Sequence, residues 1–219
     1  MFTGIIQAVG KVSDKTVQGG DVRLGIDTGN LGLLSTELGD SIAVNGVCLT
    51  VVEMNANQFW ADVSRETLDL TMMGKIAVGN EVNLEKALTL STSLGGHLVS
   101  GHVDGVGEVI LRKDSGRAIK FVIRAPDGLA RYIAHKGSIC VDGISLTVNA
   151  INGCEFELTI VPHTLSETIM NGYTLGSQVN LEVDLVARYL ERLLLGDKAA
   201  DPKAGGIDMS FLRANGFMK

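Results

Sequence analysis

The chain contains few cysteines and little proline. Its 219 residues include only 3 prolines and 3 cysteines, and the cysteines stand at positions 48, 140 and 154. No two of them have the CxxC spacing of a zinc site, and their odd number argues against a disulfide framework. Unpaired cysteines are typical of proteins from a reducing compartment. We therefore expect a cytoplasmic protein without a metal site.

Long apolar runs and basic surfaces are also absent from the sequence. No apolar run approaches the ~20 residues that a membrane-spanning helix needs. The amino-terminal segment MFTGIIQAVGK lacks the basic and apolar regions of a signal peptide. The formal net charge is −6, and no basic stripe interrupts it. This charge argues against a nucleic-acid or membrane partner.

The most informative feature of the sequence is an internal repeat with a period of 97 residues. GIIQAVGKV at 4–12 aligns with GHVDGVGEV at 101–109, and SIAVNGVCLTV at 41–51 aligns with SICVDGISLTV at 138–148. About 25 of 88 aligned positions are identical without any insertion, whereas composition alone would give ~6% identity. The repeat is therefore a true duplication.

A period of this length matches a small domain and is too long for a solenoid repeat. We therefore predict two homologous domains, 1–97 and 98–194, which are called the first and second copy below. The second copy is expected to end in a helix, and residues 196–219 are expected to form a carboxy-terminal tail.

Each copy has the pattern of short strands, with β-branched residues that partly alternate and are separated by Gly, Asn or Asp. The 27 glycines suit a protein with many turns. Residues 30–39 and 64–74, with their counterparts 127–137 and 162–172, are predicted to be helical. About six strands per copy indicate a small antiparallel barrel, and a small sandwich remains the alternative.

Residues 185–195 change from a strand pattern to a helix pattern. Apolar residues recur at i, i+4 and i+8 from Val186 to Leu194. They predict an amphipathic helix of about three turns that ends at Gly196. Its apolar face could serve self-association or packing within the chain, and the pattern does not separate these alternatives.

Two copies of one domain suggest two copies of one kind of site, and the positions that differ show where the sites diverged. The chemical differences are Cys48 against Ser145, Ile5 against His102, and Glu66 against His163. Taken singly, these signals are weak, because a lone cysteine in an apolar strand is most often a small buried residue. The histidines of GGHLVSGH also lack the spacing of a metal motif.

Four motifs, taken together and in order, resemble a known family. MFTGII at the amino terminus, NGVCLTV, GGHLVSGH and DGISLTV are similar to the motifs of riboflavin synthase of the trimeric type. The resemblance covers residues 1 to about 190. It implies an all-β fold of two homologous six-stranded Greek-key barrels in tandem plus a C-terminal α-helix that gathers three chains into a homotrimer.

The resemblance also implies a reaction that needs no metal and no cofactor. Two molecules of 6,7-dimethyl-8-ribityllumazine are dismutated, and one gives a four-carbon unit to the other. The products are riboflavin and 5-amino-6-(D-ribitylamino)uracil, and this is the last step of riboflavin biosynthesis. In the family, each barrel binds one lumazine, and the reacting pair forms between barrels of neighbouring subunits. Two identical substrates that play different roles explain why the copies are similar but not identical.

The site residues follow by matched position. The resemblance implies that His102 is an acid or base and that Cys48 is a nucleophile or proton carrier, with Ser41 and Asp184 as further catalytic candidates. It implies a first pocket formed by Phe2, Gly4, Ile5, Ile6, Ser41, Cys48, Leu49, Thr50, Asp62, Val63, Ser64, Arg65, Glu66 and Thr67. It implies a second pocket formed by Gly101, His102, Val103, Lys136, Ser145, Leu146, Thr147, Thr159, Ile160, Val161, Pro162, His163 and Thr164.

Two other functions compete with the synthase. Lumazine proteins, which act as light-emission antennae, share the duplicated fold and hold a lumazine or flavin without converting it. In that group, other residues stand at the positions of Cys48 and His102. In this chain, both the cysteine and the histidine are present. A trimeric scaffold without a ligand is the third alternative. The tail after Leu195 matches no family element, and its docking to lumazine synthase is a further hypothesis.

Overall fold

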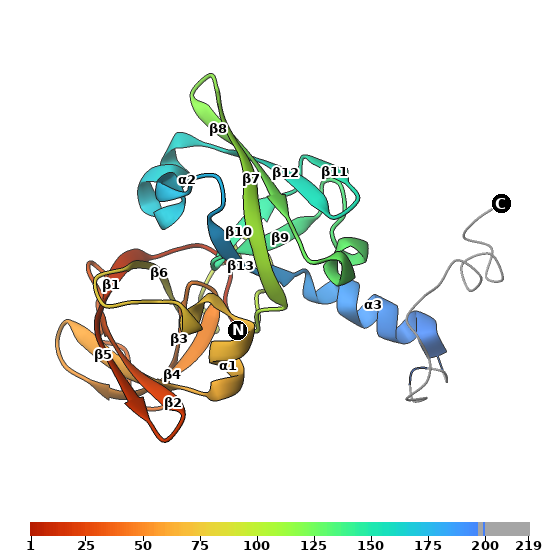
Figure 1. Ribbon diagram of the computed structural model, residues 1–219. Coiled ribbons are helices and arrows are strands. Elements are labelled where there is room, and N and C mark those ends of the chain that lie inside the picture. The colour runs from red at the N-terminus through yellow and green to blue at the C-terminus, as the bar shows by residue number, and fades with distance from the viewer. Residues whose placement is uncertain (197–198, 200–219) are drawn as a thin grey trace, which may run out of the picture. The chain divides into compact units, whose positions relative to one another are not determined.

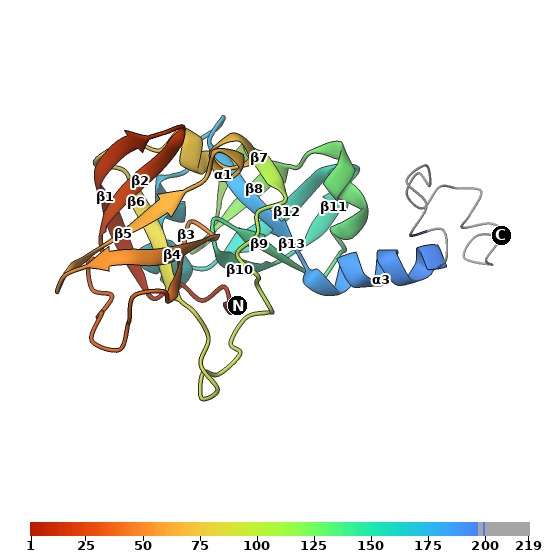
Figure 2. The same ribbon diagram turned by 90° about the horizontal axis from the view of Figure 1, so that it is seen from below.

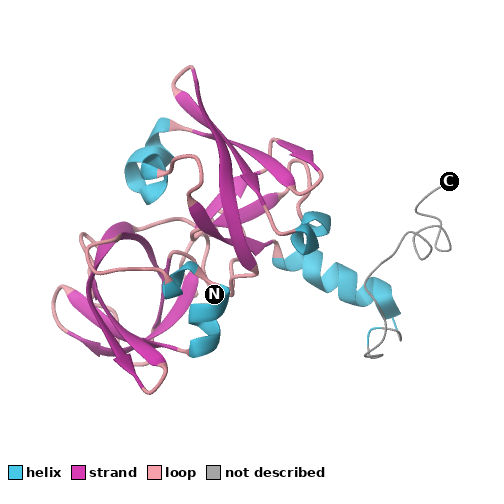
Figure 3. Ribbon diagram, in the orientation of Figure 1, coloured by secondary structure: helices cyan, strands magenta, loops and turns pink. Residues whose placement is uncertain are grey.

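The computed structural model describes residues 1–196 and 199. The chain divides into two compact units, of which the first is Met1–Asp184 and the second begins at Leu185. The first unit contains both copies of the repeat and consists mainly of strands, with short helices in the connections (Figure 1, Figure 3). Among the described residues, no helix combines the length and apolarity needed to cross a membrane.

The first copy forms a closed barrel of six antiparallel strands. The order of strands around the barrel is β1-β2-β5-β4-β3-β6, which is a Greek-key order because sequential strands β2 and β3 are not neighbours. The strands are β1 (Ala8–Gln18), β2 (Asp21–Asp27), β3 (Ser41–Val44), β4 (Val47–Met54), β5 (Gln58–Val63) and β6 (Glu81–Lys86). The predicted six-stranded barrel is confirmed for this copy.

The second copy has the same order of pairing but seven strands. The sheet runs β10-β9-β13-β7-β8-β12-β11. Its strands are β7 (Gly105–Ser115), β8 (Ala118–Arg124), β9 (Ser138–Val141), β10 (Ile144–Thr147), β11 (Ala150–Asn152), β12 (Glu155–Ile160) and β13 (Gln178–Val183). Two homologous β units followed by a helix are as predicted, but the strand count of the second unit differs.

The extra strand arises where one strand is interrupted. β10 and β11 together correspond to β4, and the break falls at Val148 and Asn149. β4 has a register shift between Val51 and Glu53, at the matching place. A bulge of this kind bends a strand and locally disrupts its ladder. The Asn149 amide still donates to the Glu157 carbonyl across the break. A bulge stronger than the one in β4 therefore explains why this strand is divided into β10 and β11.

In each copy, a short helix and a 3₁₀ turn lie in the connection that leads to the last strand. They are α1 (Arg65–Leu70) with the 3₁₀ turn η1 (Met72–Gly74), and α2 (Pro162–Glu167) with η3 (Ile169–Gly172). Both were predicted. The 3₁₀ turn η2 (Asp127–Tyr132) accounts for part of the third predicted helix.

The helix predicted at 30–39 is wrong. The segment forms separate turns, in which Leu31 donates to Thr28 and Thr36 donates to Leu33. Gly39 has a φ of +95°, which is outside the helical region and ends any helix there. The apolar spacing that suggested a helix instead serves to bury Leu31 and Leu33 in the barrel core.

Each copy has its own hydrophobic core, built from matching positions. Fully buried pairs of matched residues, one from each core, are Leu24 and Phe121, Ile26 and Ile123, Phe59 and Phe156, and Leu84 and Leu181. Burial of a large apolar side chain contributes about 1.5–3 kcal/mol. The duplication therefore preserves two complete cores within one unit.

The two copies meet at the tips of matching hairpins. Asn45-Gly46 and Asp142-Gly143 form two-residue turns in which all four residues have positive φ, from 43° to 84°, as type I′ turns require. A Cβ atom on Gly46 would lie 2.7 Å from the backbone nitrogen of Gly143. Only glycine permits this approach of two backbones.

Reciprocal hydrogen bonds surround this contact. The Nδ2 atom of Asn83 donates to the carbonyl of Asp142, and the Nδ2 atom of Asn180 donates to the carbonyl of Asn45, both at 2.9 Å. Asn83 and Asn180 are matched residues, as are Asn45 and Asp142. The copies are therefore related by an approximate two-fold axis through the hairpin tips.

The second unit contains α3 (Leu185–Leu195), an amphipathic helix of 11 residues. Its bounds agree with the predicted helix 185–195. The predicted tail lies outside the described residues from 200 onward and at 197–198.

Candidate functional site

A pocket of about 270 Å³ brings together Cys48 and His102. Cys48 lies in β4, whereas His102 belongs to the long connection between β6 and β7 (Figure 2). We call this cavity the Cys48 pocket. Its lining residues are Val47, Cys48, Glu66, Thr67, Leu70, Thr71, Gly101, His102 and Val103. The first copy thus supplies the lining residues from β4, α1 and Thr71, and the second copy supplies Gly101, His102 and Val103.

Glycine at position 101 allows this segment of the second copy to approach β4. The Cys48 amide donates to the Gly101 carbonyl at 2.9 Å. Gly101 has a φ of +82°, and a Cβ there would lie 2.6 Å from the Cβ of Cys48 and 2.9 Å from the Phe2 ring. The close contact fixes the backbone beside His102, whose exposed side chain borders the pocket.

The matched loop of the first copy approaches the second copy in the same way. The Ser145 amide donates to the Gly4 carbonyl at 2.7 Å. Gly4 has a φ of +76°, and a Cβ there would lie 2.6 Å from the Cβ of Ser145. We call the group of Thr3, Gly4, Gly96, His97 and Ser145 the Ser145 cluster.

This arrangement corrects the grouping expected from the sequence. Gly4–Ile6 were expected beside Cys48, and Gly101–Val103 beside Ser145. The structure places each loop against the other copy. Alignment of the two copies shows which residues correspond, but it cannot show whether a loop packs on its own barrel or on its partner.

His97 is a member of the Ser145 cluster that the sequence did not single out for the site. Its Nδ1 atom lies 2.7 Å from the Ser145 hydroxyl oxygen. Its Nε2 atom is buried and has no hydrogen-bond partner among the described residues. Burial lowers the pKa of His97, although the Asp184 carboxylate acts in the opposite direction. Burial therefore favours the neutral form of the imidazole that lies beside the Ser145 hydroxyl.

The two sites thus differ in chemistry as the sequence suggested. The Cys48 pocket gathers a thiol, an imidazole and the carboxylate of Glu66. In the Ser145 cluster, the Ser145 hydroxyl is hydrogen-bonded to the His97 imidazole, whose pKa is lowered by burial. The residue that matches His102 is Ile5, which has no acid–base group. Acid–base groups are therefore concentrated in the Cys48 pocket.

Ser41 lies apart from the other catalytic candidates. It borders a separate cavity of about 150 Å³ together with Lys86 and Thr89, and it is not among the residues that line the Cys48 pocket. Ser41 is paired with Thr50 across β3 and β4. The structure therefore does not bring Ser41 together with Cys48 and His102.

Phe2 is fully buried. It packs in a small cluster with Ala43, Val99 and Cys140, and Cys48 lies against the same cluster. Phe2, which was expected in the first pocket, therefore lies behind Cys48 and is not among the residues that line the Cys48 pocket.

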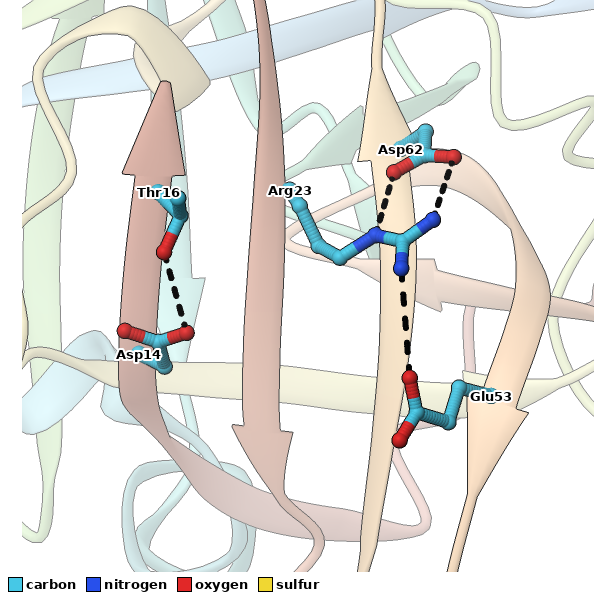
Figure 4. A network of polar contacts seen from close by, with 5 residues as sticks. All are labelled: Asp14, Thr16, Arg23, Glu53 and Asp62. Atoms are coloured by element: carbon cyan, nitrogen blue, oxygen red, sulfur yellow. Dashed lines mark hydrogen bonds and ion pairs between the residues drawn. The ribbon is translucent and has the colours of Figure 1, made fainter. Parts of the chain in front are cut away.

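Asp62 lies on the exposed face of β5, where it forms an ion pair with Arg23. The Nε and Nη2 atoms of Arg23 donate to its two carboxylate oxygens at 2.8 Å and 3.1 Å, and Glu53 lies beside the same guanidinium (Figure 4). On β1, which pairs with the strand of Arg23, the Thr16 hydroxyl donates to Asp14. The hydrogen bond from Arg23 lowers the pKa of Asp62. Asp62 does not line the Cys48 pocket.

The remaining predicted site residues fall into three groups. Three strand residues are buried in the hydrophobic cores: Leu49, Val63 and Ile160. Half-buried residues are Ile6, Leu146 and Thr164. Exposed residues are Thr50, Ser64, Arg65, Lys136, Thr147, Thr159, Val161, Pro162 and His163.

Lys136 has an unusual backbone conformation among these residues. Its φ is +63°, and the matched residue of the first copy is Gly39 with a φ of +95°. A side chain in the left-handed region costs about 1–2 kcal/mol relative to the right-handed region. Residues held in such conformations are concentrated at functional sites.

Comparison with known proteins identifies relatives along the whole chain. The family model of the "Lumazine binding domain" matches residues 3–87 and 100–184. The chain is 53% identical over 218 residues to the riboflavin synthase of Photobacterium phosphoreum, covering 100% of both proteins. It is 40% identical to the riboflavin synthase of Bacillus subtilis (strain 168), covering 99% of this chain and 100% of that protein.

Solved structures of LumP are also similar. LumP complexed with riboflavin has a TM-score of 0.76 and 29% sequence identity, covering 84% of this chain and 99% of that chain. LumP complexed with 6,7-dimethyl-8-(1'-D-ribityl) lumazine has a TM-score of 0.75 and 27% identity, with the same coverage. The identity to LumP is thus lower than the identity to the riboflavin synthases.

Proposed function

Because this chain belongs to the riboflavin synthase family and carries two lumazine binding domains, we propose that the Cys48 pocket and the Ser145 cluster each bind one 6,7-dimethyl-8-ribityllumazine. The enzyme transfers a four-carbon unit from one lumazine to the other, which yields riboflavin and 5-amino-6-(D-ribitylamino)uracil. The two products together contain all the atoms of two substrates. The reaction therefore consumes no water, oxidant or reductant.

The observation that carries the proposal for the site is the meeting of Cys48 and His102 in one cavity. These residues come from different copies, and their matched residues, Ser145 and Ile5, cannot perform the same acid–base chemistry. A reaction between two identical molecules needs one pocket that favours the donor and another that favours the acceptor. Divergence at these two positions provides that difference.

The chemistry needs a base that removes a proton from the acidic C7 methyl group and a group that returns protons during elimination. We assign the proton transfers to His102, with Cys48 as the nucleophile or proton carrier and Glu66 beside them. Holding two rings face to face also supplies part of the rate, because it replaces a bimolecular encounter. Ser145 and its neutral partner His97 offer hydrogen bonds to the second lumazine without a charge.

Phe2, Ser41, Lys136 and Asp184 retain proposed supporting roles. Phe2 supports the Cys48 pocket from behind. Asp184 lies close enough to His97 to oppose the lowering of its pKa by burial. Lys136 offers a cation, and Ser41 offers a hydroxyl in the neighbouring cavity.

We also propose that the active form is a homotrimer in the cytoplasm. In the family, the reacting pair forms between the first barrel of one subunit and the second barrel of the next. The apolar stripe of α3 is the proposed contact between chains, and the free cysteines suit a reducing compartment. Light scattering should give three chains per particle, and a chain that ends at Asp184 should be monomeric and inactive.

Association with lumazine synthase remains a proposal for the tail. That segment lies outside the described residues.

The experiment that tests the function uses purified protein and one substrate. The protein is incubated with 6,7-dimethyl-8-ribityllumazine and a chelator, and riboflavin is followed by absorbance. One riboflavin should form for every two lumazines consumed. Bound but unconverted lumazine would instead favour the non-catalytic antenna alternative, and an absence of binding would contradict both functions.

A further inference from the structure

Two buried glutamates hold the loops that cross between the copies. Glu85 lies in β6 and Glu182 in β13, at matching positions of the repeat. Each is only 3% exposed. Buried carboxylates are costly unless hydrogen bonds satisfy them, so the partners of these two residues indicate what they do.

Glu182 accepts four hydrogen bonds from the loop that carries His102. Its Oε1 atom accepts from the amide and hydroxyl of Ser100 at 2.6 Å and 2.7 Å. Its Oε2 atom accepts from the amides of Gly101 and His102 at 2.9 Å and 3.1 Å. Four donors fill the acceptor sites of one carboxylate, so the loop is fixed over three successive residues.

Glu85 holds the matched loop at the amino terminus. Its Oε1 atom accepts from the amide and hydroxyl of Thr3, both at 2.7 Å, and its Oε2 atom accepts from the Gly4 amide at 2.9 Å. Burial raises the pKa of Glu85, although these hydrogen bonds oppose the shift. The loop is therefore held in the same way, with one bond fewer.

Each glutamate acts on the site of the other copy. Glu182 belongs to the second copy, but the Gly101 carbonyl that it helps to position accepts the Cys48 amide of the first copy. Glu85 belongs to the first copy, but the Gly4 carbonyl accepts the Ser145 amide of the second.

We propose that Glu182 is the positioning residue for His102 in the Cys48 pocket and that Glu85 is the positioning residue for the Ser145 cluster. The assignment rests on the proposed function of these two sites. Neither glutamate lines the Cys48 pocket, so Glu182 acts there through the backbone of Gly101 and His102. The two sites can therefore be perturbed one at a time.

A glutamine at either position tests the proposal because it keeps the size of the side chain. Its amide nitrogen cannot accept a hydrogen bond, so one carboxylate oxygen is replaced by a donor that faces other donors. Loss of hydrogen bonds to a buried charged group should change a local equilibrium by about 10- to 100-fold. Glu85→Gln and Glu182→Gln are matched controls for each other.

Hydrogen exchange reads the positioning without any activity. In Glu182→Gln, exchange should accelerate about 10- to 100-fold at residues 100–102 and at Cys48, while residues 3–5 and Ser145 keep their protection. In Glu85→Gln, the pattern should be reversed. Equal acceleration at both loops, or at neither, would overturn the proposal.

Kinetics then connect the loop to the reaction. In the wild-type background, Glu182→Gln should lower kcat more than it raises KM. In the His102→Gln background, the same change should cost little further, because two residues that act through one group are not additive. Glu85→Gln should remain additive with His102→Gln. Full additivity of Glu182→Gln with His102→Gln would contradict the assignment.

The design separates the two possible failures. If wild-type protein makes no riboflavin, the proposed function fails, and hydrogen exchange still decides whether the glutamates hold the loops. If Glu182→Gln does not fold, Ser100→Ala removes one of the four donors and should accelerate exchange at 100–102 only. Thr3→Ala is its matched control, and unchanged exchange in both of these variants would contradict the proposal.

Discussion

The hydroxyl of Tyr173 donates a hydrogen bond to the carboxylate of Asp142, and both residues are buried where the two copies meet. The Asp142 carboxylate also accepts a hydrogen bond from the backbone amide of Asn180 at 2.8 Å. Burial is the main cause that raises the pKa of Asp142 to about 7, while the two hydrogen bonds oppose it. The matched residue of the first copy, Asn45, has no charge to lose or gain.

This pair predicts a pH dependence of stability. Folding raises the pKa of Asp142 above its ordinary value. The contribution of Asp142 to the free energy of unfolding is therefore complete at low pH and is lost as pH rises through about 7. Asp142→Asn copies the residue of the first copy and should remove this dependence. Above neutral pH the variant should be more stable, by up to about 4 kcal/mol. Urea unfolding between pH 5 and 9 measures the difference, and parallel curves for the two proteins would contradict it.

Gly101→Ala should damage the Cys48 pocket. The added Cβ would meet the Cβ of Cys48 at 2.6 Å, and φ is +82°, so both collision and strain oppose it. We expect a loss of about 2–4 kcal/mol in the free energy of unfolding together with loss of turnover. Gly19→Ala is the control, because φ is +62° there but no atom lies within 4 Å. A similar loss in both variants would show that strain, and not the pocket contact, is responsible.

Cys48→Ser should lower turnover much more than substrate affinity. Serine keeps the backbone bond to Gly101 and nearly the same volume, but it lacks an acidic thiol. We expect kcat to fall by about 100-fold, while the dissociation constant measured by lumazine fluorescence changes little. Cys154→Ser is the control, because Cys154 does not line the Cys48 pocket, and it should leave kcat near the wild-type value. Equal loss of binding and turnover would make Cys48 a packing residue.

Lys136→Gly separates backbone strain from substrate contact. The residue has a φ of +63°, and the first copy has Gly39 at the matching position. Relief of strain is partly offset by the greater flexibility of glycine, so stability should rise by up to about 1 kcal/mol. If Lys136 contacts the substrate, KM should rise in the same variant. A stability gain with unchanged KM would remove Lys136 from the proposed site.

The duplication made most of the fold predictable. Strand patterns predicted about six strands per copy, the family resemblance implied the barrel, and the apolar stripe from Val186 to Leu194 predicted α3. The break between β10 and β11 was not visible, because a bulge depends on how a strand bends around the core. The turns at 30–39 were mistaken for a helix since buried leucines at short spacing serve either structure.

The composition of the site was predictable only in part. Cys48, Glu66, Thr67 and Gly101–Val103 do line one cavity, but the sequence could not show that the last three, which belong to the second copy, pack against the first. His97 was missed because its role depends on a contact with Ser145, 48 residues away. A signal for the glutamates did exist, since GNEVNLE and GSQVNLE keep an acid at the end of a buried strand.

The exchange of loops between the copies has a consequence for how this chain can change over generations. A substitution within Gly4–Ile6 alters the surroundings of Ser145, whereas one within Gly101–Val103 alters those of Cys48. Compensating substitutions should therefore pair the amino terminus with the neighbourhood of Ser145, across the duplication. The copies are thus obliged to evolve together, and a domain transplanted alone from a relative would bring a loop adapted to a partner it no longer has.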